Sequence, residues 1–569
     1  MSISSNETYD YIIVGGGSAG CVLANRLSSD PKNNVLLIEA GMDTPPGKVP
    51  EEILDSYPMP LFYGDKYIWP GLKAQTSGSV QGSRIYEQAK VMGGGSSINV
   101  QSANRGLPRD YDEWAKMGAT AWGWDDVLPY FRKLEQDLDC NGEQHGNSGP
   151  IPIRRIAPDA WPAFPHRMSA AFSRHGLPLR YDQNAEFEDG VYPAAFSNIN
   201  DQRVSTAAGY LDTKTRARPN LTIAAEKRVT RLIVKGRRVT GVEITDAQAT
   251  QKIVLAHRVI LCAGALQSPA LLMRAGIGPG ADLHKLGIPV ISDLPGVGQN
   301  LRDHPTLTLC QYLPKELRLP RDYRRASMVS VRYSSETKGG SPSDMYVGVS
   351  ARAGWHALGA RMALYFLWCN QPYSVGSLAL RTPSADDFPN VNLNLLSDRR
   401  DTIRMIDGVR KMVNILATPL LNPDPRDLFP ASFSPRIKAL SRVSRLNKVL
   451  TSIIGFGLDA PQPFRFWLLK TFLLNGVSFP ELLKNDQKLE DFVHKNVFGV
   501  WHPAGTCRIG QETDRLAVVD NNGKVFGMEN IWVADASIMP QLPTANTNIP
   551  TIMIAEKISD GLLTKTYAN

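Results

Sequence analysis

The chain has 569 residues, of which 43% are hydrophobic and 21% charged, and its formal net charge is +8 at pH 7. This length and composition predict a soluble globular protein with more than one domain, and they exclude a disordered or fibrous chain. The positive charge is spread along the sequence without interleaved aromatic residues, so nucleic acid is not expected as a partner.

The cysteine spacing and the apolar runs exclude further classes of protein. The six cysteines stand far apart without a C-x-x-C pair, so neither a disulfide framework nor a metal site is indicated. No apolar run is long enough to span a membrane, and the start "MSISSNETYD" lacks the features of a secretory signal. A cytoplasmic protein without a spanning segment is the default expectation.

The first predicted elements form a dinucleotide-binding unit. A β-prone run over residues 9–14 leads into Gly15-x-Gly17-x-x-Gly20, a helix is predicted over 19–27, and "NVLLIEAG" predicts a second strand that ends at Glu39. The glycines permit a tight turn, a close backbone approach to a pyrophosphate and close packing of helix on strand. Glu39 lies where an acid can bind a ribose 2′-hydroxyl and would repel a 2′-phosphate. The turn therefore indicates NAD or FAD rather than NADP.

The same strand-and-turn pattern returns late in the chain. "RVILCAGALQSPALLMRAGIG", residues 258–278, predicts a strand, an Ala-Gly turn and a helix. Residues 530–562 predict a strand, Asp535, a loop and a long amphipathic helix. A cofactor domain built from the start, middle and end of the chain favours a large two-part cofactor, and no second G-x-G-x-x-G offers an NAD(P)H site. FAD is therefore favoured, with Asp535 near its ribityl or pyrophosphate part.

Two further segments carry a family resemblance. "AKVMGGGSSIN", residues 89–99, and "GALQSPALLMRAGIG", residues 264–278, resemble the signature segments of the glucose–methanol–choline (GMC) oxidoreductases, and "WHPAGT" with "ANTNIPT" extends the resemblance to the C-terminal end. The family fold is α/β, with a discontinuous Rossmann-like FAD-binding domain beside a substrate domain that contains an antiparallel sheet. The implied FAD domain spans 8–155, 215–308 and 497–566, and the substrate domain spans 156–214 and 309–496.

The resemblance also implies the remaining residues around the cofactor. Gly94 lies in a glycine-rich turn along the flavin, and Val229 flanks the adenine. Some members attach FAD through a histidine of this turn, but Ile98 stands at that position, so non-covalent FAD is expected. The other cofactor residues implied by the resemblance are Ser18, Ala19, Ala40, Met92, Ser97, Asn99, Val100, Ala263, Trp501, Ala536, Asn548 and Thr551.

His502 and Asn546 are the predicted catalytic residues. The resemblance places His502 in the active-site loop, and its ordinary pKa of about 6.5 suits a proton acceptor. The family has His or Asn at position 546; Asn cannot take a proton, so Asn546 would hold the substrate oxygen. The other eight histidines show no supporting pattern. The implied reaction oxidises an aromatic or furanic primary alcohol by hydride transfer to flavin N5, with O₂ or another electron acceptor completing the cycle.

Other reactions on this scaffold stay open at this stage. They are a dehydrogenase that uses a quinone or dye, a hydroxynitrile lyase and a light-driven fatty-acid decarboxylase. The oligomeric state is not predicted.

The far wall of the pocket is expected from a strand within residues 363–380. Phe366, Trp368 and Cys369 on this strand, with Trp501 beside the predicted base, are the candidate substrate contacts. Residues 423–487 are unlike the rest of the resemblance. Within them, "PFRFWLLKTFLLNGV", residues 463–477, favours a buried packing helix, with a lid, a dimer surface or a membrane-surface helix as alternatives.

Overall fold

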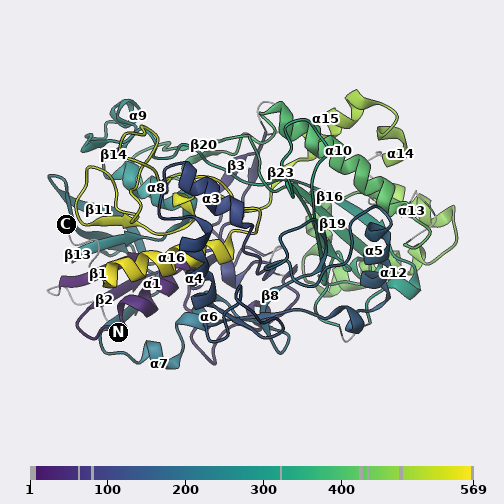
Figure 1. Ribbon diagram of the computed structural model, residues 1–569, viewed down its shortest axis with the longest axis horizontal. Coiled ribbons are helices and arrows are strands. Elements are labelled where there is room, and N and C mark those ends of the chain that lie inside the picture. The colour runs from purple at the N-terminus through teal and green to yellow at the C-terminus, as the bar shows by residue number, and fades with distance from the viewer. Residues whose placement is uncertain are drawn as a thin grey trace.

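The computed structural model describes residues 8–59, 61, 64–77, 82–320, 323–421, 424, 427–431, 435–472 and 478–564. Its two large sheets lie at opposite ends of an elongated molecule, and both chain ends lie beside the first sheet (Figure 1). The mixed α/β architecture expected from the sequence is confirmed.

The first sheet collects strands from distant parts of the chain. Its order is β10-β2-β1-β13-β12-β11, and β24 pairs with β13. β10, β2, β1, β13 and β24 run parallel, whereas β11, β12 and β13 form an antiparallel ribbon. Parallel strands covered on both faces carry continuous apolar runs, as in the buried "VLLI" of β2. The strands are β1 (Thr8–Val14), β2 (Val35–Ile38), β10 (Leu221–Ala224), β11 (Arg228–Lys235), β12 (Arg238–Thr245), β13 (Gln251–Leu261) and β24 (Ile531–Val533).

Helices from the two ends of the chain pack together on this sheet. α1 (Ser18–Leu27) contacts α16 (Asn548–Leu563), and α16 also contacts α4 (Trp124–Leu134). The buried carboxylate of Glu556 accepts hydrogen bonds from Arg26 at 2.6 and 2.9 Å. Because α16 packs between two helices, it is buried on nearly all sides rather than amphipathic.

The second sheet is antiparallel throughout. Its order is β22-β16-β19-β18-β17-β7, and β23 pairs with β16. α10 (Arg399–Leu416) packs on β19, and α5 (Ala163–Ser173) packs on β7. The predicted domain boundary at 308 falls within β16, and the one at 497 lies directly before β23. β23 pairs with the first two residues of β16, so both paired segments belong to stretches predicted for the FAD domain. The strands are β7 (Gly190–Pro193), β16 (Pro305–Tyr312), β17 (Val329–Tyr333), β18 (Met345–Ser350), β19 (Met362–Cys369), β22 (Leu428–Pro430) and β23 (Phe498–Gly499).

Smaller elements surround the two sheets. Three small sheets are formed by β3 (Lys73–Gln75), β4 (Ser83–Ile85), β20 (Ser377–Ala379) and β21 (Asn390–Asn392); by β5 (Glu135–Asp137), β6 (Ile151–Arg154), β8 (Phe196–Ile199) and β9 (Gln202–Arg203); and by β14 (Ile277–Gly278) and β15 (Ser292–Asp293). The other α-helices are α2 (Glu51–Leu54), α3 (Pro108–Lys116), α6 (Thr206–Tyr210), α7 (Thr213–Arg216), α8 (Gly264–Arg274), α9 (Gly280–Lys285), α11 (Pro435–Ser441), α12 (Arg445–Leu458), α13 (Phe464–Phe472), α14 (Phe479–Leu482) and α15 (Asp486–Asn496).

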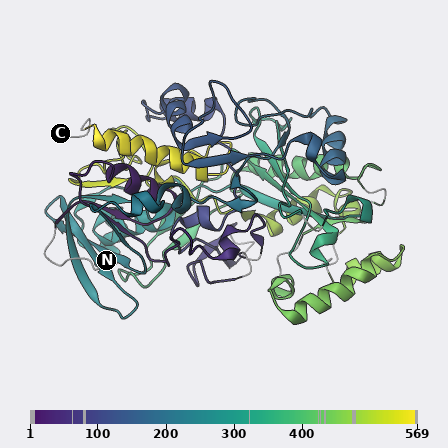
Figure 2. The ribbon, with the colours of Figure 1, turned by 90° about the horizontal axis from the view of Figure 1, so that it is seen from below.

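The helix expected to be buried within residues 463–477 is buried on one side only. In α13 Leu469 is buried, but Phe464 and Trp467 are 49% and 54% exposed; residues 473–477 lie outside the described residues. Figure 2 shows the light-green helices of this segment at the lower edge of the molecule. The described helices include none that is both long and apolar enough to cross a bilayer.

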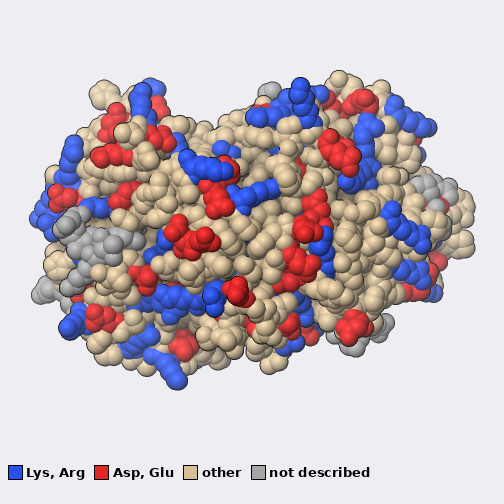
Figure 3. Space-filling model, in the orientation of Figure 1, with Lys and Arg blue, Asp and Glu red and all other residues tan. Residues whose placement is uncertain are grey.

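Charged side chains are mixed on the surface. On the face in Figure 3, groups of Lys and Arg side chains lie among groups of Asp and Glu, with uncharged residues between them.

Candidate functional site

The first glycine turn joins β1 to α1 in close contact with the strand next to it. Gly15 has φ +101°, and a Cβ there would lie 2.5 Å from the carbonyl oxygen of Cys262. A Cβ on Gly20 would lie 1.9 Å from the oxygen of Gly15, which explains why the third glycine supports packing. α1 has no side-chain N-cap, so its first backbone N–H groups are available to an anion.

Glu39 lies directly after β2, beside this turn. Its Oε2 accepts a hydrogen bond from the Gly16 N–H at 2.8 Å, and its Oε1 accepts one from the Gly41 N–H at 2.7 Å. Burial raises the pKa of Glu39 to about 7. Each carboxylate oxygen can accept a second hydrogen bond, so Glu39 can still bind a hydroxyl.

The second glycine turn packs directly on the first. The Gly93 N–H donates to the Gly16 oxygen at 2.7 Å, and a Cβ on Gly94 would lie 2.7 Å from the Cα of Gly17. Ser97 closes this turn, because its Oγ donates to the Met92 carbonyl at 2.7 Å. The two turns therefore form one glycine-lined floor.

A third segment completes this end of the site. The carboxylate of Asp535 accepts hydrogen bonds from the Gly264 N–H at 2.8 Å, from Ser268 Oγ at 2.6 Å and from the Ser537 N–H at 2.9 Å. Asp535 thus ties the end of β24 to the start of α8. The side-chain oxygen of Asn99 is likewise bonded to protein, accepting from Arg203 at 2.8 Å.

One cavity of ≈ 1230 Å³ runs along all three segments to His502. Most of the predicted cofactor residues line it, namely Gly15, Gly17, Ser18, Ala19, Glu39, Ala40, Gly94, Asn99, Val100, Val229, Ala263, Trp501, Asp535, Ala536, Asn548 and Thr551. Gly20, Met92 and Ser97 are not among its lining residues, because they pack beneath the turns.

His502 is the centre of a polar cluster at the far end of this cavity. The side chain of Asn546 lies with Nδ2 at 3.1 Å from His502 Nε2. On the other side, His502 Nδ1 lies 2.8 Å from Nδ1 of His304. Within the described part of the chain, Asn546 Oδ1 and His304 Nε2 have no hydrogen-bond partner. Asn546 thus presents an unpaired acceptor next to His502.

His304 is a site residue that sequence reasoning missed. It is fully buried, 198 positions before its partner, and no local motif marks it. Burial lowers the pKa of His304 to about 4, against the opposing effect of the Asn370 and Pro543 backbone. Burial is the main cause that holds the pKa of His502 well below its usual range, and the electrostatic effect of His304 adds to it. Both rings are therefore neutral at neutral pH.

Asp303 fixes the backbone of both histidines. Its Oδ1 accepts hydrogen bonds from the His304 N–H at 2.8 Å and the His502 N–H at 3.0 Å, and its Oδ2 accepts one from Tyr86 Oη at 2.5 Å. Gly499 packs against this carboxylate, because a Cβ there would lie 2.1 Å from Asp303 Oδ2. The histidine pair is thus held on a rigid support.

Aromatic residues of the second sheet form the wall opposite. Trp368 stacks on Tyr346 with ring centroids 4.5 Å apart and lies edge-on to His502 at 6.4 Å. Phe366 and Trp368 line the cavity as predicted. Cys369 does not; it is fully buried, with Sγ 3.6 Å from Met345 Sδ. Its prediction as a substrate contact was wrong, because successive strand residues face opposite sides of a sheet.

Trp501 lies at the edge of the same chamber. Its side chain lines the cavity, is 37% exposed and donates from Nε1 to Glu87 Oε2 at 2.9 Å. It therefore borders the chamber on the side open to solvent.

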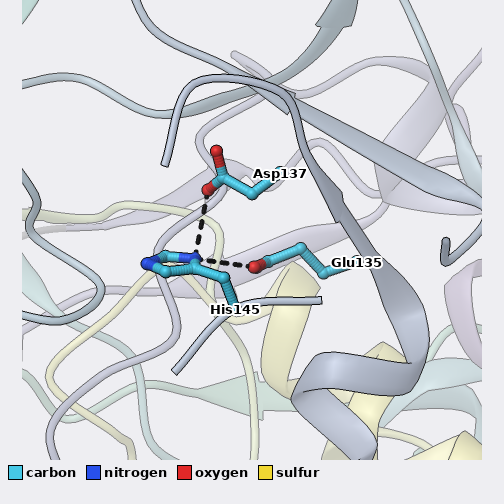
Figure 4. A group of neighbouring side chains, drawn as sticks. All are labelled: Glu135, Asp137 and His145. Atoms are coloured by element: carbon cyan, nitrogen blue, oxygen red, sulfur yellow. Dashed lines mark hydrogen bonds and ion pairs between the residues drawn. The ribbon is translucent and has the colours of Figure 1, made fainter. Parts of the chain in front are cut away.

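A second histidine cluster lies outside this cavity. His145 Nδ1 lies 2.9 Å from Glu135 and 3.2 Å from Asp137, as Figure 4 shows. Although this set has the composition of a metal site, Arg105 binds Glu135 at 2.5 Å and Arg155 binds Asp137 at 2.8 Å. Despite its burial, the hydrogen bonds that His145 donates to the carboxylates raise its pKa to about 10. Cationic side chains thus already neutralise these carboxylates.

Comparison with known proteins identifies the family. Two family models, both described as GMC oxidoreductase, match residues 9–306 and 372–555. The protein belongs to the GMC oxidoreductase family. This GMC oxidoreductase is 44% identical to 5-(hydroxymethyl)furfural oxidase from Methylovorus sp. (strain MP688), over 99% of this chain and 100% of the relative. It is 34% identical to the oxygen-dependent choline dehydrogenase of Paraburkholderia phymatum, over 97% and 92% of the two chains.

Solved structures agree with the family assignment. Pyridoxine 4-oxidase from Mesorbium loti superposes with a TM-score of 0.80 and 27% identity, covering 98% of this chain and 99% of its own. A fungal aryl-alcohol oxidase has the same fold, with a TM-score of 0.75 over 99% and 100% of the two chains at 19% identity. The predicted family and enzyme class are therefore confirmed.

The site fits the FAD on which GMC oxidoreductases depend. The two packed glycine turns form a floor without side chains. The uncapped N-terminus of α1 faces the cavity, and Glu39 lines the cavity beside the first turn. Next to the N-terminus of α1, the first residues of α16, Asn548 and Thr551, line the cavity, and Ser18 Oγ of α1 donates to Asn548 Oδ1 at 2.7 Å. Thr547 before them adds no side-chain cap. Two neighbouring helix N-termini that face one cavity suit a cofactor that carries negative charge.

Proposed function

We propose that this GMC oxidoreductase is an oxidase of aromatic or furanic primary alcohols, with the aldehyde and hydrogen peroxide as products. The observation that carries the proposal is the His502–Asn546 pair, which places a neutral imidazole and an amide donor 3.1 Å apart beside an aromatic wall. The 44% identity to a 5-(hydroxymethyl)furfural oxidase supports the same substrate class. Stacked rings such as Tyr346 and Trp368 suit a planar substrate.

The contact between the two histidines decides where His502 can accept a proton. Two neutral rings that meet through Nδ1 share one proton, so one ring donates and the other accepts. If His502 donates from Nδ1 to His304, its Nε2 carries a lone pair toward Asn546 and the cavity. The opposite tautomer would place a proton on His502 Nε2 and block it as a base. We assign the first tautomer, which puts the His304 proton on Nε2 and leaves His304 Nδ1 to accept from His502.

In this arrangement each residue has one task. His502 Nε2 takes the hydroxyl proton of the alcohol, Asn546 donates from Nδ2 to the substrate oxygen, and His304 accepts from His502 Nδ1. FAD, when bound, would supply the two-electron oxidising chemistry, with O₂ as the final electron acceptor. Burial of His502 lowers the polarity around it, which strengthens hydrogen bonds to the developing alkoxide.

We also propose that FAD is held without a covalent bond. Ile98 lines the cavity directly after the second glycine turn and packs on the small cluster that contains Ile53 and Val91. An aliphatic side chain cannot attach to the flavin, so acid should release free FAD from the polypeptide.

Anaerobic mixing with alcohols tests the function. Flavin absorbance should bleach with furanic and benzylic primary alcohols, and air should restore it within the turnover time with one hydrogen peroxide per aldehyde. Fast bleaching followed by slow recovery in air, but fast recovery with a quinone, would make the protein a dehydrogenase. Absence of bleaching with every alcohol would overturn the proposal and favour the lyase reading.

A further inference from the structure

The helices α12 and α13 form an outward-facing platform on the second sheet, defined here as residues 445–472. Leu458 and Leu469 are buried in a cluster with β16 and β19 residues. Asp459, in the turn after α12, binds Arg318 at 2.5 Å and Arg361 at 2.9 Å. These contacts fix which faces of the two helices point away from the protein.

The outward face of α12 is apolar over its full length. The exposed residues recur at spacings of three and four, which places them on one side of the helix. Their exposed fractions are far above those of an ordinary packing helix, as for Ile453 at 65% and Phe456 at 80%. The stripe consists of Leu446, Val449, Leu450, Ile453 and Phe456, with Val443 just before the helix.

α13 extends this apolar surface with two aromatic rings. Phe464 and Trp467 are 49% and 54% exposed and stack with ring centroids 5.6 Å apart. A Cβ on Gly457 of α12 would lie 2.7 Å from Leu468 and 3.8 Å from Phe464, so the two helices touch here. Stripe and aromatic pair therefore form one continuous patch.

Basic residues flank the patch, and the one acidic residue of the platform, Asp459, is already paired with Arg318 and Arg361. Residues 428–458 contain no Asp or Glu. Arg445 and Lys448 of α12 and Lys470 of α13 are exposed. By helical geometry, Arg445 and Lys448 lie along one flank of the apolar stripe, between it and the buried face. A helix with an apolar face and a basic flank is suited to the interface of an anionic bilayer.

We propose that the α12–α13 platform docks the protein on anionic lipid surfaces. The apolar stripe and the aromatic pair would enter the boundary between headgroups and acyl chains, and Arg445, Lys448 and Lys470 would reach lipid phosphates. The preceding helix brings the site close to that surface, because Ala439 of α11 and Arg442 beside it line the active-site cavity. The protein would thus lie on the membrane without crossing it.

Charge argues against a second copy of the chain as the occupant. A two-fold contact through the platform would bring the Arg445 and Lys448 side chains of two copies together with no acidic residue from residues 428–458 to neutralise them. An anionic lipid surface supplies the missing negative charge.

Co-sedimentation of the FAD-loaded protein with vesicles tests the proposal. The protein should pellet with mixed phosphatidylglycerol and phosphatidylcholine vesicles at low salt, much less at high salt, and little with phosphatidylcholine alone. Replacing both Arg445 and Lys448 with Gln should weaken partitioning roughly 30-fold, from the usual effect of two basic residues at a lipid surface.

Apolar variants and a matched control complete the test. Ile453→Glu with Phe456→Glu should weaken partitioning by at least roughly 100-fold. Leu255→Glu, on β13 and 46% exposed, should bind like the wild type. FAD content and alcohol-driven bleaching verify folding in every variant. Equal binding by all variants, or binding to neutral vesicles alone, would overturn the proposal. So would a dimer in solution that the Ile453→Glu, Phe456→Glu variant dissociates while vesicles fail to bind.

Discussion

His304 and His502 meet through their Nδ1 atoms at 2.8 Å, and Asp303 holds the backbone N–H of each. The contact uses the inner nitrogen of His502 and leaves the outer one, Nε2, toward the cavity. The proposed base therefore depends on a second histidine that never touches the alcohol. His304 is a positioning residue in this scheme.

Replacing His304 with Phe should slow anaerobic flavin reduction roughly 10- to 100-fold, the range for losing the partner that orients a functional histidine. FAD content should not change. His304→Asn should restore much of the rate, because its Oδ1 can accept the His502 Nδ1 proton. Stopped-flow bleaching of the three proteins makes the comparison. If Asn rescues no better than Phe, His304 has only a packing role.

Replacing His502 with Ala should slow flavin reduction by roughly 10²–10⁴-fold, the usual effect of losing a general base. The defect should shrink at high pH, where more of the alcohol is ionised. Because burial keeps the pKa of His502 well below its usual range, the wild-type rate should stay level from alkaline pH down through pH ~6.5. A wild-type rate in His502→Ala would refute the assignment of the base.

Asn546→Ala tests the oxygen-holding role separately. Loss of its Nδ2 donor should slow bleaching by about 10²-fold, as for other single donors to a developing oxyanion. Because Asn546 takes no proton, high pH should not rescue this variant. Recovery at high pH as complete as that of His502→Ala would contradict the division of tasks.

Glu39→Ala should weaken FAD binding roughly 10- to 100-fold, because a charged acceptor is lost from a buried hydrogen bond. Glu39→Gln, which keeps an oxygen acceptor, is the matched control and should lose less. FAD released on serial dilution, followed by its fluorescence, measures the difference. Equal retention by all three proteins would remove Glu39 from the cofactor site.

The His145 cluster should contribute to stability in a pH-dependent way. Its folded pKa of about 10 lies above the ordinary value of 6.5, so the contribution is complete below pH 6.5 and is lost as the pH rises toward 10. The difference in Tm between wild type and His145→Gln should therefore be largest at low pH and should narrow across this window. A constant difference would show that the imidazole charge is not involved.

Local patterns were enough to predict the cofactor-binding half of the fold. The Gly15 turn, Glu39 and the segment before α8 lie within short runs whose strand, turn and helix signals are sequential. His304 could not be found this way, because its role comes from β16 meeting a loop 198 positions later. The prediction for Cys369 failed because neighbouring residues of a strand point to opposite faces of the sheet, so Cys369 faces away from the cavity that Trp368 lines. The exposed side of α13 was not predicted, because the sequence of an apolar helix does not reveal which of its faces other elements cover.

The Arg26–Glu556 contact has a consequence for how the protein is made. β24 and α16, which complete the first sheet and cover α1, come from residues 531–563 of the 569-residue chain. The glycine turn that starts at residue 15 therefore lacks its covering helix until residues 531–563 have been synthesised. Truncation before residue 531 would leave α1 and the edge of β13 uncovered.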